Sequence, residues 1–411
     1  MSTCKKWFFG FFLILGIAAL FVSMRTQKGE AADRRDVPPF GVSGPHSVGK
    51  RDLVTEGERP LPVIIWYPTT LDNNEGAAAS PYKVKLGAPL GEVIIATTQG
   101  HAAHDAPYDF SAGPYPLVIL SPGFAIGSVS YSWLAEHLAS YGFVVIAPEH
   151  QETLDPQNEL WRAAIIRPQD ILAVFAYVDE QTGPGGALDG LIDGEETAVI
   201  GHSYGGYTAL AAAGAQIDTS SFEVHCNEAI RTEDPTAWLC DMLLPHLAGM
   251  ANLAGLDAVP EGLWPPAADP RVDAIVAMAG DAYFFGPPGL AKIDVPVLAM
   301  GGTLDEDTPF LWGPQPTYEH TVSPRKAQIA LNDAEHMIFT NTCQSIRWYA
   351  KPLASEFCDD SVWDRDQAHD LVKHFTTAFL LAELKHDSDA AVVLTPNAVE
   401  FPNVTYKAQG Y

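Results

Sequence analysis

The sequence predicts an α/β protein with a mostly parallel central sheet, flanking helices and an insertion after one helix. Short apolar runs alternate with longer amphipathic stretches, as a parallel sheet with crossover helices requires. A Gly-His-Ser-Tyr-Gly segment at residues 201–205 joins an apolar run directly to a helix of small residues. The chain has 411 residues, 47% of them hydrophobic, and no linker interrupts its middle. One large domain is therefore expected over residues 48–390.

The apolar runs place the elements of this domain. Two runs at residues 51–55 and 61–67 predict an antiparallel pair that opens the sheet. Further strands are expected at residues 115–121, 142–147, 197–200, 272–278, 295–300 and 326–332, and helices at 131–140, 167–180, 207–213 and 364–384.

Two segments lack the rhythm of the rest. Residues 214–269 have no strand alternation and contain several prolines and glycines, which predicts an insertion after the helix at 207–213. Both a lid over a site and a surface excursion fit this insertion. Residues 391–411 carry few core positions and are expected to form a C-terminal tail.

Residues 1–32 form a separate N-terminal segment. Lys5 and Lys6 precede an almost unbroken apolar run at residues 7–24, and a polar stretch follows. This pattern is typical of a signal peptide or of an N-terminal membrane anchor, and the sequence leaves both open. Residues 33–47 are expected to be a linker. The protein is thus predicted to be exported, as a periplasmic, extracellular or membrane-anchored protein.

Cysteine spacing agrees with export, and the net charge argues against two kinds of partner. Cys226 and Cys240 lie in one segment and Cys343 and Cys358 in another, so two local disulfides are predicted, each worth about 3 kcal/mol. The formal net charge of −27 argues against a nucleic-acid partner and against electrostatic attraction to anionic lipid.

Ser203 is the predicted nucleophile. It stands between glycines at the turn from an apolar strand to a helix, where its hydroxyl would project above the sheet at a helix N-terminus. The pattern Gly-x-Ser-x-Gly is common by chance, but the strand-turn-helix context favours a nucleophile elbow.

A serine nucleophile needs a base, and the base needs an acid to orient it. His336 follows the last predicted strand of the core by a few residues and is the expected base. Asp305, in the loop Gly-Gly-Thr-Leu-Asp-Glu-Asp-Thr-Pro, is the favoured acid. Asp281 at the end of the preceding strand and the nearby Asp307 remain alternatives.

Two backbone amides are expected to form an oxyanion hole. Tyr204 follows the nucleophile and would supply one amide. The Ser-Pro-Gly-Phe segment ends an early strand and would supply the other through Phe124, since Pro122 has no N–H. No metal site is expected: His101 and His104 have a spacing that suits a metal, but no third ligand is near in the sequence.

Three segments resemble a known family: Pro-Leu-Val-Ile-Leu-Ser-Pro-Gly-Phe at 116–124, Leu-Ala-Ser-Tyr-Gly-Phe-Val-Val-Ile-Ala-Pro-Glu-His at 138–150, and Gly-His-Ser-Tyr-Gly-Gly at 201–206. They are similar to platelet-activating-factor acetylhydrolases and related bacterial hydrolases often labelled dienelactone-hydrolase-like. The resemblance covers about residues 48–384. It implies an α/β-hydrolase fold and hydrolysis of small-molecule or lipid carboxylic esters without metal or organic cofactor.

Two departures limit what the resemblance implies. Dienelactone hydrolases carry cysteine where this chain has Ser203, which argues against their substrate. The acid of the acetylhydrolases matches Asp281, whereas that of bacterial lipases and polyester-degrading cutinases matches Asp305. The expected function is therefore ester hydrolysis through an acyl-serine intermediate. A polyester or cutin hydrolase and a catalytically silent anchored binding module on the same fold are the alternatives.

Overall fold

A computed structural model describes residues 37–57, 59–71, 81–88, 91–234, 237–343, 345–351, 357–358 and 360–411. The chain divides after Asp36, and the described residues belong to the second of its two units, Val37–Tyr411. The predicted signal peptide or anchor and the start of the predicted linker lie outside the described residues. Among the residues described, no helix has the length and apolar character needed to span a membrane.

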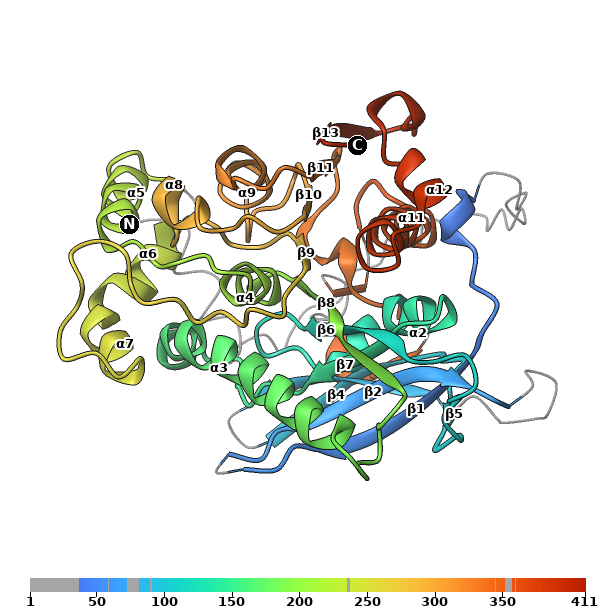
Figure 1. Ribbon diagram of the computed structural model, residues 1–411. Coiled ribbons are helices and arrows are strands. Elements are labelled where there is room, and N and C mark those ends of the chain that lie inside the picture. The colour runs from blue at the N-terminus through green and yellow to red at the C-terminus, as the bar shows by residue number, and fades with distance from the viewer. Residues whose placement is uncertain are drawn as a thin grey trace. The chain divides into compact units, whose positions relative to one another are not determined.

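A ten-stranded sheet forms the centre of the second unit, in the order β13-β11-β10-β9-β8-β6-β7-β2-β1-β5 (Figure 1). The six strands that stand in the order β7-β6-β8-β9-β10-β11 within the sheet run parallel to one another. Three pairings are antiparallel: β2 with β7, β1 with β2, and β13 with β11. The strand bounds are β1 Ser47–Val54, β2 Pro62–Thr69, β5 Ala103–His104, β6 Tyr115–Ser121, β7 Val144–Pro148, β8 Ile192–His202, β9 Ala274–Met278, β10 Val297–Gly302, β11 Lys326–Leu331 and β13 Val404–Gln409.

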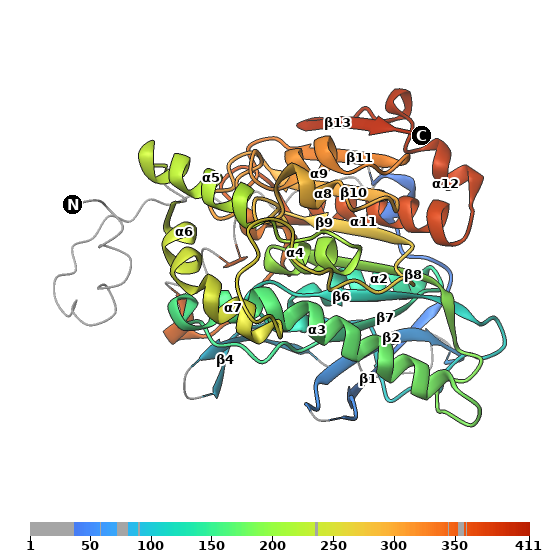
Figure 2. The same ribbon diagram turned by 60° about the vertical axis from the view of Figure 1, so that its left-hand side comes forward.

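Helices cover both faces of this sheet, and each face has its own buried core (Figures 1 and 2). One face packs against α3 (Pro156–Thr182) and α4 (Tyr204–Ala212), the other against α2 (Ser132–Ser140) and α11 (Arg365–Leu384). The strands are apolar on both faces, as buried parallel strands must be. In β6, for example, alternate residues of the fully buried run enter the two cores.

A small second sheet lies beside the first. It contains β3 (Tyr82–Ala88), β4 (Gly91–Thr98) and β12 (Ser345–Ile346), in the order β12-β4-β3, and all its pairings are antiparallel. The sequence analysis predicted none of these strands. The pairing of β12 with β4 joins segments about 250 residues apart in the chain, which no local pattern reveals.

The helix α3 begins at Pro156, well before the predicted start near residue 167. Pro168 lies inside it, although proline in a helix interior removes a hydrogen bond to the carbonyl four residues earlier. That carbonyl belongs to Ala164, and the hydroxyl of Tyr207 donates a hydrogen bond to it at 2.9 Å. A side chain of α4 thus satisfies the group that Pro168 leaves free, and the helix continues.

The predicted insertion is helical. It contains α5 (Thr219–Arg231), α6 (Trp238–Leu243), the 3-10 turn η5 (Leu244–His246) and α7 (Leu247–Leu253). Its apolar side chains belong to the same buried core as α3 and α4. The predicted disulfide between Cys226 and Cys240 is present and joins α5 to α6.

The end of the chain is part of the sheet. Residues 391–411 were expected to drape over the domain as a tail, but β13 pairs along its whole length with β11, from Val404 opposite Leu331 to Gln409 opposite Lys326. Alternate residues of β13 pack against the core beside α11. The structural domain therefore reaches beyond the expected boundary at residue 390.

Candidate active site

Ser203 occupies the sharp turn between β8 and α4. Its backbone has φ 58° and ψ −124°, a region that residues other than glycine rarely adopt. The amide of Ser203 donates to the carbonyl oxygen of Met278 at 2.8 Å, which ties the turn to the end of β9. A Cβ atom at Gly205 would collide with the carbonyl oxygen of Ser121, so glycine is required there for the turn to pack against β6. The sequence motif thus forms a strained elbow.

His336 and Asp305 lie together at the ends of neighbouring parallel strands. His336 opens the 3-10 turn η6 (His336–Phe339) after β11, and Asp305 lies in the loop after β10. The Nδ1 atom of His336 is 2.7 Å from Oδ2 of Asp305. The other carboxylate oxygen, Oδ1, accepts from the amides of Asp307 and Thr308 at 3.0 and 2.7 Å. Asp305 is therefore held from both sides with one oxygen directed at the imidazole.

The surroundings of His336 favour its charged form. Burial alone would lower the pKa of this imidazole, but the nearby carboxylates, first Asp305 and then Asp307 and Asp281, raise the pKa to about 9. A site that stabilises an imidazolium suits a base that receives a proton during a reaction.

Asp281 lies in the loop after β9 and is buried. Burial raises the pKa of its carboxyl to about 7, and its Oδ1 atom has no hydrogen-bond partner among the described residues. The described contacts include no hydrogen bond between Asp281 and His336. Of the three acids considered from the sequence, Asp305, Asp281 and Asp307, Asp305 is the one that the structure brings to Nδ1 of the imidazole.

The loop after β6 presents one unengaged amide. The amide of Gly123 donates to the hydroxyl of Tyr131 at 3.0 Å, and the amide of Ala125 donates to Oε2 of Glu152 at 3.1 Å. Between them, the amide of Phe124 has no acceptor within the described part of the chain. Tyr204 is the first residue of α4, where an amide has no acceptor within its own helix. Both residues expected to form the oxyanion hole thus keep an amide available.

Three side chains that the sequence analysis did not single out hold the loop after β6. Arg167, 1% exposed, donates to the carbonyl oxygens of Pro122 and Gly123 at 2.6 and 2.9 Å. The same guanidinium bonds both carboxylate oxygens of Glu152. Beside it, Nε2 of His150 lies 2.9 Å from the hydroxyl of Ser121. The loop is therefore fixed by bonds to its carbonyl groups as well as by the amides of Gly123 and Ala125.

A chain of hydrogen bonds links this loop to the base through His202, the second residue of the Gly-His-Ser-Tyr-Gly motif. Nε2 of His202 lies 3.0 Å from the carbonyl oxygen of His336, and its Nδ1 lies 2.8 Å from the hydroxyl of Tyr131. Burial holds the pKa of His202 well below its usual value, so the ring is neutral. A carbonyl only accepts, so Nε2 carries the proton and Nδ1 accepts from Tyr131. The histidine in the motif was the readable signal for this contact.

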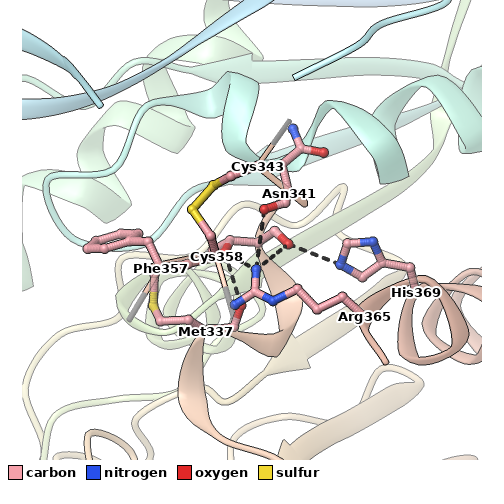
Figure 3. The surroundings of a disulfide bond; sticks show 8 residues. Met337, Asn341, Cys343, Phe357, Cys358, Arg365 and His369 are labelled. Atoms are coloured by element: carbon pink, nitrogen blue, oxygen red, sulfur yellow. Dashed lines mark hydrogen bonds between the residues drawn. A yellow bond between two sulfur atoms is a disulfide. The ribbon is translucent and has the colours of Figure 1, made fainter. Parts of the chain in front are cut away.

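The segment after His336 is held by α11 and by the second predicted disulfide, Cys343 with Cys358 (Figure 3). Arg365 donates to the carbonyl oxygens of Thr340 and Asn341 at 3.1 and 3.2 Å. Figure 3 shows the guanidinium directed at this backbone, next to the disulfide. The side chain of Asn341 also donates to the carbonyl oxygen of Val129, at 2.6 Å. The base is thus followed by a tightly fixed segment.

The histidines at 101 and 104 do not gather a metal-binding set. His104 pairs with the carboxylates of Asp52 and Asp105 at the surface. Among the described residues no group of three or more histidine, cysteine, aspartate or glutamate side chains could hold a metal ion.

Two family models match overlapping parts of this chain. A family model described as Chlorophyllase matches residues 106–237, and one described as Platelet-activating factor acetylhydrolase, isoform II, matches residues 32–155. The second match confirms the resemblance indicated by the sequence motifs.

Similar curated proteins match over part of their length. Bis(hydroxyethyl) terephthalate hydrolase of Streptomyces coelicolor is 34% identical over 146 residues, which cover 36% of this chain and 43% of that protein. Cutinase est2 of Thermobifida alba is 35% identical over 104 residues, 25% of this chain and 32% of the cutinase. Chlorophyllase-2 of Arabidopsis thaliana is 27% identical over 220 residues, 49% of this chain and 64% of the chlorophyllase. The matched segments span less than two thirds of each relative.

A solved structure is similar over nearly the whole chain. The ferulic acid esterase from Streptomyces cinnamoneus aligns with a TM-score of 0.56 and 20% identity, covering 88% of this chain and 96% of the esterase. At this identity the likeness establishes the shared fold, and the α/β-hydrolase fold implied by the sequence motifs is confirmed.

Proposed function

We propose that this protein, an α/β hydrolase by its fold, cleaves carboxylic esters with Ser203 as nucleophile, His336 as base and Asp305 as the orienting acid. The observation that carries the proposal is the 2.7 Å contact between His336 Nδ1 and Asp305 Oδ2, made at the strand ends beside a strained serine elbow. The relatives named as a cutinase, a terephthalate ester hydrolase and chlorophyllases support the reaction class.

The proposed reaction follows from these positions. Ser203 attacks the ester carbonyl while Nε2 of His336 takes the hydroxyl proton, and Asp305 stabilises the resulting imidazolium through Nδ1. The negative charge that develops on the carbonyl oxygen lies between the amides of Phe124 and Tyr204. His336 then gives its proton to the leaving alcohol, and an acyl-serine remains. Water, deprotonated by His336, then attacks the acyl carbon, and the bond from that carbon to Oγ of Ser203 breaks. His336 returns the proton to Oγ, which releases the carboxylic acid and restores Ser203.

A small ester is the proposed substrate, and a polyester or cutin is the second candidate. The second candidate is supported by the similarity to proteins that are named as a cutinase and a terephthalate ester hydrolase. The two disulfides support an oxidising compartment, and so a periplasmic, extracellular or membrane-anchored location.

Replacing Ser203 by alanine tests the proposal. The Ser203→Ala variant should lose covalent labelling by a fluorophosphonate and should lower turnover of 4-nitrophenyl acetate by about 10⁶-fold, because triad members act as a unit. Wild-type protein should label and turn over; if it does neither, the catalytically silent binding module is the better description. Labelling of the variant at the wild-type rate would show that another residue is the nucleophile.

Substrate class needs a separate measurement. The wild-type enzyme should be compared on 4-nitrophenyl esters of increasing acyl length, on bis(hydroxyethyl) terephthalate and on a solid polyester film. Hydrolysis of the soluble esters without release from the film is expected for a small-ester hydrolase. Release from the film at a comparable rate would favour the polyester candidate.

A further inference from the structure

A second serine-histidine-aspartate array lies beside the loop that carries Phe124. The hydroxyl of Ser121, the last residue of β6, is 2.9 Å from Nε2 of His150. Nδ1 of His150 is in turn 2.7 Å from Oδ2 of Asp170, the same distance that separates the base and the acid of the candidate active site. The proposed mechanism uses none of these three residues.

The array is closed to substrate. Ser121 is 0% exposed, and the side chains of His150 and Asp170 are each 2% exposed. An ester cannot reach the hydroxyl of Ser121, so the array is not a second catalytic centre. Its hydrogen bonds act on the protein itself, and their effect depends on what Ser121 holds in place.

The imidazole of His150 is held in one neutral form. Oδ1 of Asp170 pairs with the guanidinium of Arg59, so the charge of the carboxylate is already balanced. Burial, together with the guanidinium groups of Arg167 and Arg59, keeps the pKa of His150 well below its usual value. Because a carboxylate only accepts hydrogen bonds, Nδ1 carries the proton and Nε2 accepts from the hydroxyl of Ser121.

One turn of α3 fixes the end of β6 and the start of the loop. Arg167 and Asp170 are three residues apart and therefore lie on the same side of α3. This helix packs against the face of the sheet that includes β6 and β7 (Figure 1). Arg167 bonds the first two carbonyl oxygens of the loop. Asp170 reaches the preceding residue, Ser121, through His150.

Ser121 is also the residue at which the loop meets the nucleophile elbow. A Cβ atom at Gly205 would lie 2.0 Å from the carbonyl oxygen of Ser121, so the backbones of the two residues are in close contact. The amide of Phe124 follows three residues later. A displacement of Ser121 would therefore move this amide relative to the elbow.

We propose that His150 and Asp170 are positioning residues for the oxyanion hole, which act by holding Ser121 in place. The inference rests on the proposed function, in which the amide of Phe124 faces the negative charge that develops on the ester oxygen. Without Asp170 the imidazole is free to adopt the other tautomer, and Ser121 then loses its acceptor. A misplacement of about 1 Å in such a site can cost about 10²-fold in rate.

Steady-state kinetics of Ser121→Ala and Asp170→Asn on 4-nitrophenyl acetate test the proposal. Each variant should lower kcat by about 10-fold and keep KM within about twofold of wild type, because the loop contacts the transition state more than the bound ester. The double variant should lose no more than the more damaging single variant, because both substitutions break the same chain of hydrogen bonds.

A thionoester separates the oxyanion hole from the base. Its carbonyl carries sulfur in place of oxygen, and sulfur is larger and accepts hydrogen bonds weakly. The ratio of kcat/KM for 4-nitrophenyl acetate to that for 4-nitrophenyl thionoacetate therefore measures how well the amides fit the oxyanion. This ratio should fall by about 3- to 10-fold in Ser121→Ala and Asp170→Asn. It should keep its wild-type value in Asp305→Asn, which slows both substrates through the base.

Asp179→Asn is the matched control, because it is the same substitution at an exposed position of α3. The side chain of Asp179 is 63% exposed and pairs with Arg271 at the surface. Its kcat, KM and ester-to-thionoester ratio should equal those of wild type. Thermal unfolding followed by circular dichroism identifies variants that do not fold. If Asp170→Asn is one of them, Ser121→Ala, which removes a single hydroxyl, decides the question.

The outcomes separate two failures. Wild-type protein that neither reacts with a fluorophosphonate nor turns over would contradict the proposed function and, with it, this inference. In an active enzyme, wild-type kcat in folded Ser121→Ala would overturn the positioning role alone. A loss of kcat with an unchanged ester-to-thionoester ratio would overturn it as well, and so would a double variant whose loss is the product of the two single losses.

Discussion

At the scale of single residues, two buried carboxyl groups are candidates for the acid that orients His336, and their hydrogen bonds distinguish them. Asp305 accepts two backbone amides on one oxygen and faces His336 with the other. Asp281 is buried nearby with an unpartnered oxygen and a pKa raised to about 7. Both residues were candidates from the sequence. Asp281 follows β9, which neighbours the elbow strand β8, and Asp305 follows β10, which lies one strand further along the sheet.

Asp305→Asn and Asp281→Asn should therefore have very different effects. The first should lower maximal turnover by about 10⁴-fold, because the imidazole loses the group that fixes its tautomer. The second should leave turnover within about tenfold of wild type. Steady-state kinetics on folded variants, checked by circular dichroism, measure the difference. A large loss in Asp281→Asn with near-normal Asp305→Asn would move the role to Asp281.

The pH dependence of the same variants gives an independent reading. His336 must be neutral to accept a proton, so activity should rise with pH through its pKa, which the carboxylates raise to about 9. Removing the negative charge of Asp305 lowers that pKa, so the acid limb of the Asp305→Asn profile should move to lower pH. Asp281 makes a smaller contribution and its variant should move the limb less. A shift to higher pH in either variant would contradict this electrostatic account.

Arg167 is expected to position the loop that carries the Phe124 amide. Lysine retains the charge but lacks the planar fork that bonds two carbonyls and a carboxylate together. Arg167→Lys should lower kcat by about 10- to 100-fold with little change in KM, since a displaced loop mainly weakens transition-state contacts. Arg162→Lys, on the exposed side of α3, is the matched control. A rise in KM with unchanged kcat would indicate a role in substrate binding instead.

At the scale of elements, local patterns predicted most of the central sheet but not what depends on distant contacts. The run at residues 115–121 coincides with β6, and α11 begins after its N-cap Asp364 as expected. The early start of α3 was missed because a local pattern does not favour a helix that runs through Pro168, whereas the hydroxyl of the distant Tyr207 bonds the carbonyl that this proline leaves free. The alternation of Tyr82, Val84 and Leu86 in β3 was readable and was overlooked.

The candidate site divides in the same way. The serine, the base and the acid loop stand in recognisable local motifs and were predicted. Arg167 and Tyr131 were not, because their roles depend on hydrogen bonds between segments that are far apart in sequence. His202 stands inside the motif and was overlooked, although its partners are also distant in sequence. A helix arginine carries no local sign that it will meet a loop 45 residues earlier.

The disulfide Cys343–Cys358 is expected to support the base as well as the fold. It closes a loop in the segment after His336, whereas Cys226–Cys240 joins two helices of the insertion. Replacing either pair by serines should cost about 3 kcal/mol of stability. Only the Cys343→Ser/Cys358→Ser double variant should also lower kcat at a temperature where both variants are folded. Equal kcat for the two double variants would limit both bonds to a structural role.

At the scale of the whole molecule, the sheet continues from the N-terminal antiparallel strands to the last residues of the chain. Tyr406 on β13 is half-buried against the core beside α11, and its hydroxyl donates to the carbonyl oxygen of Leu394 at 2.6 Å. The ring of Tyr406 also stacks on that of Phe375, with their centres 5.7 Å apart. The final strand thus closes one edge of the sheet and joins it to α11.

This arrangement predicts that substitutions at two neighbouring residues of β13 change the stability of the protein by very different amounts. Tyr406→Ala should lower the free energy of unfolding by about 3 kcal/mol, because it removes a packed ring and leaves a cavity. Lys407→Ala, on the exposed face of the same strand, should change it by less than about 0.5 kcal/mol. Thermal or urea unfolding of the two variants measures the difference. If neither substitution changed the free energy of unfolding, β13 would contribute little to stability. The C-terminal tail expected from the sequence would then describe the end of the chain better than an edge strand does.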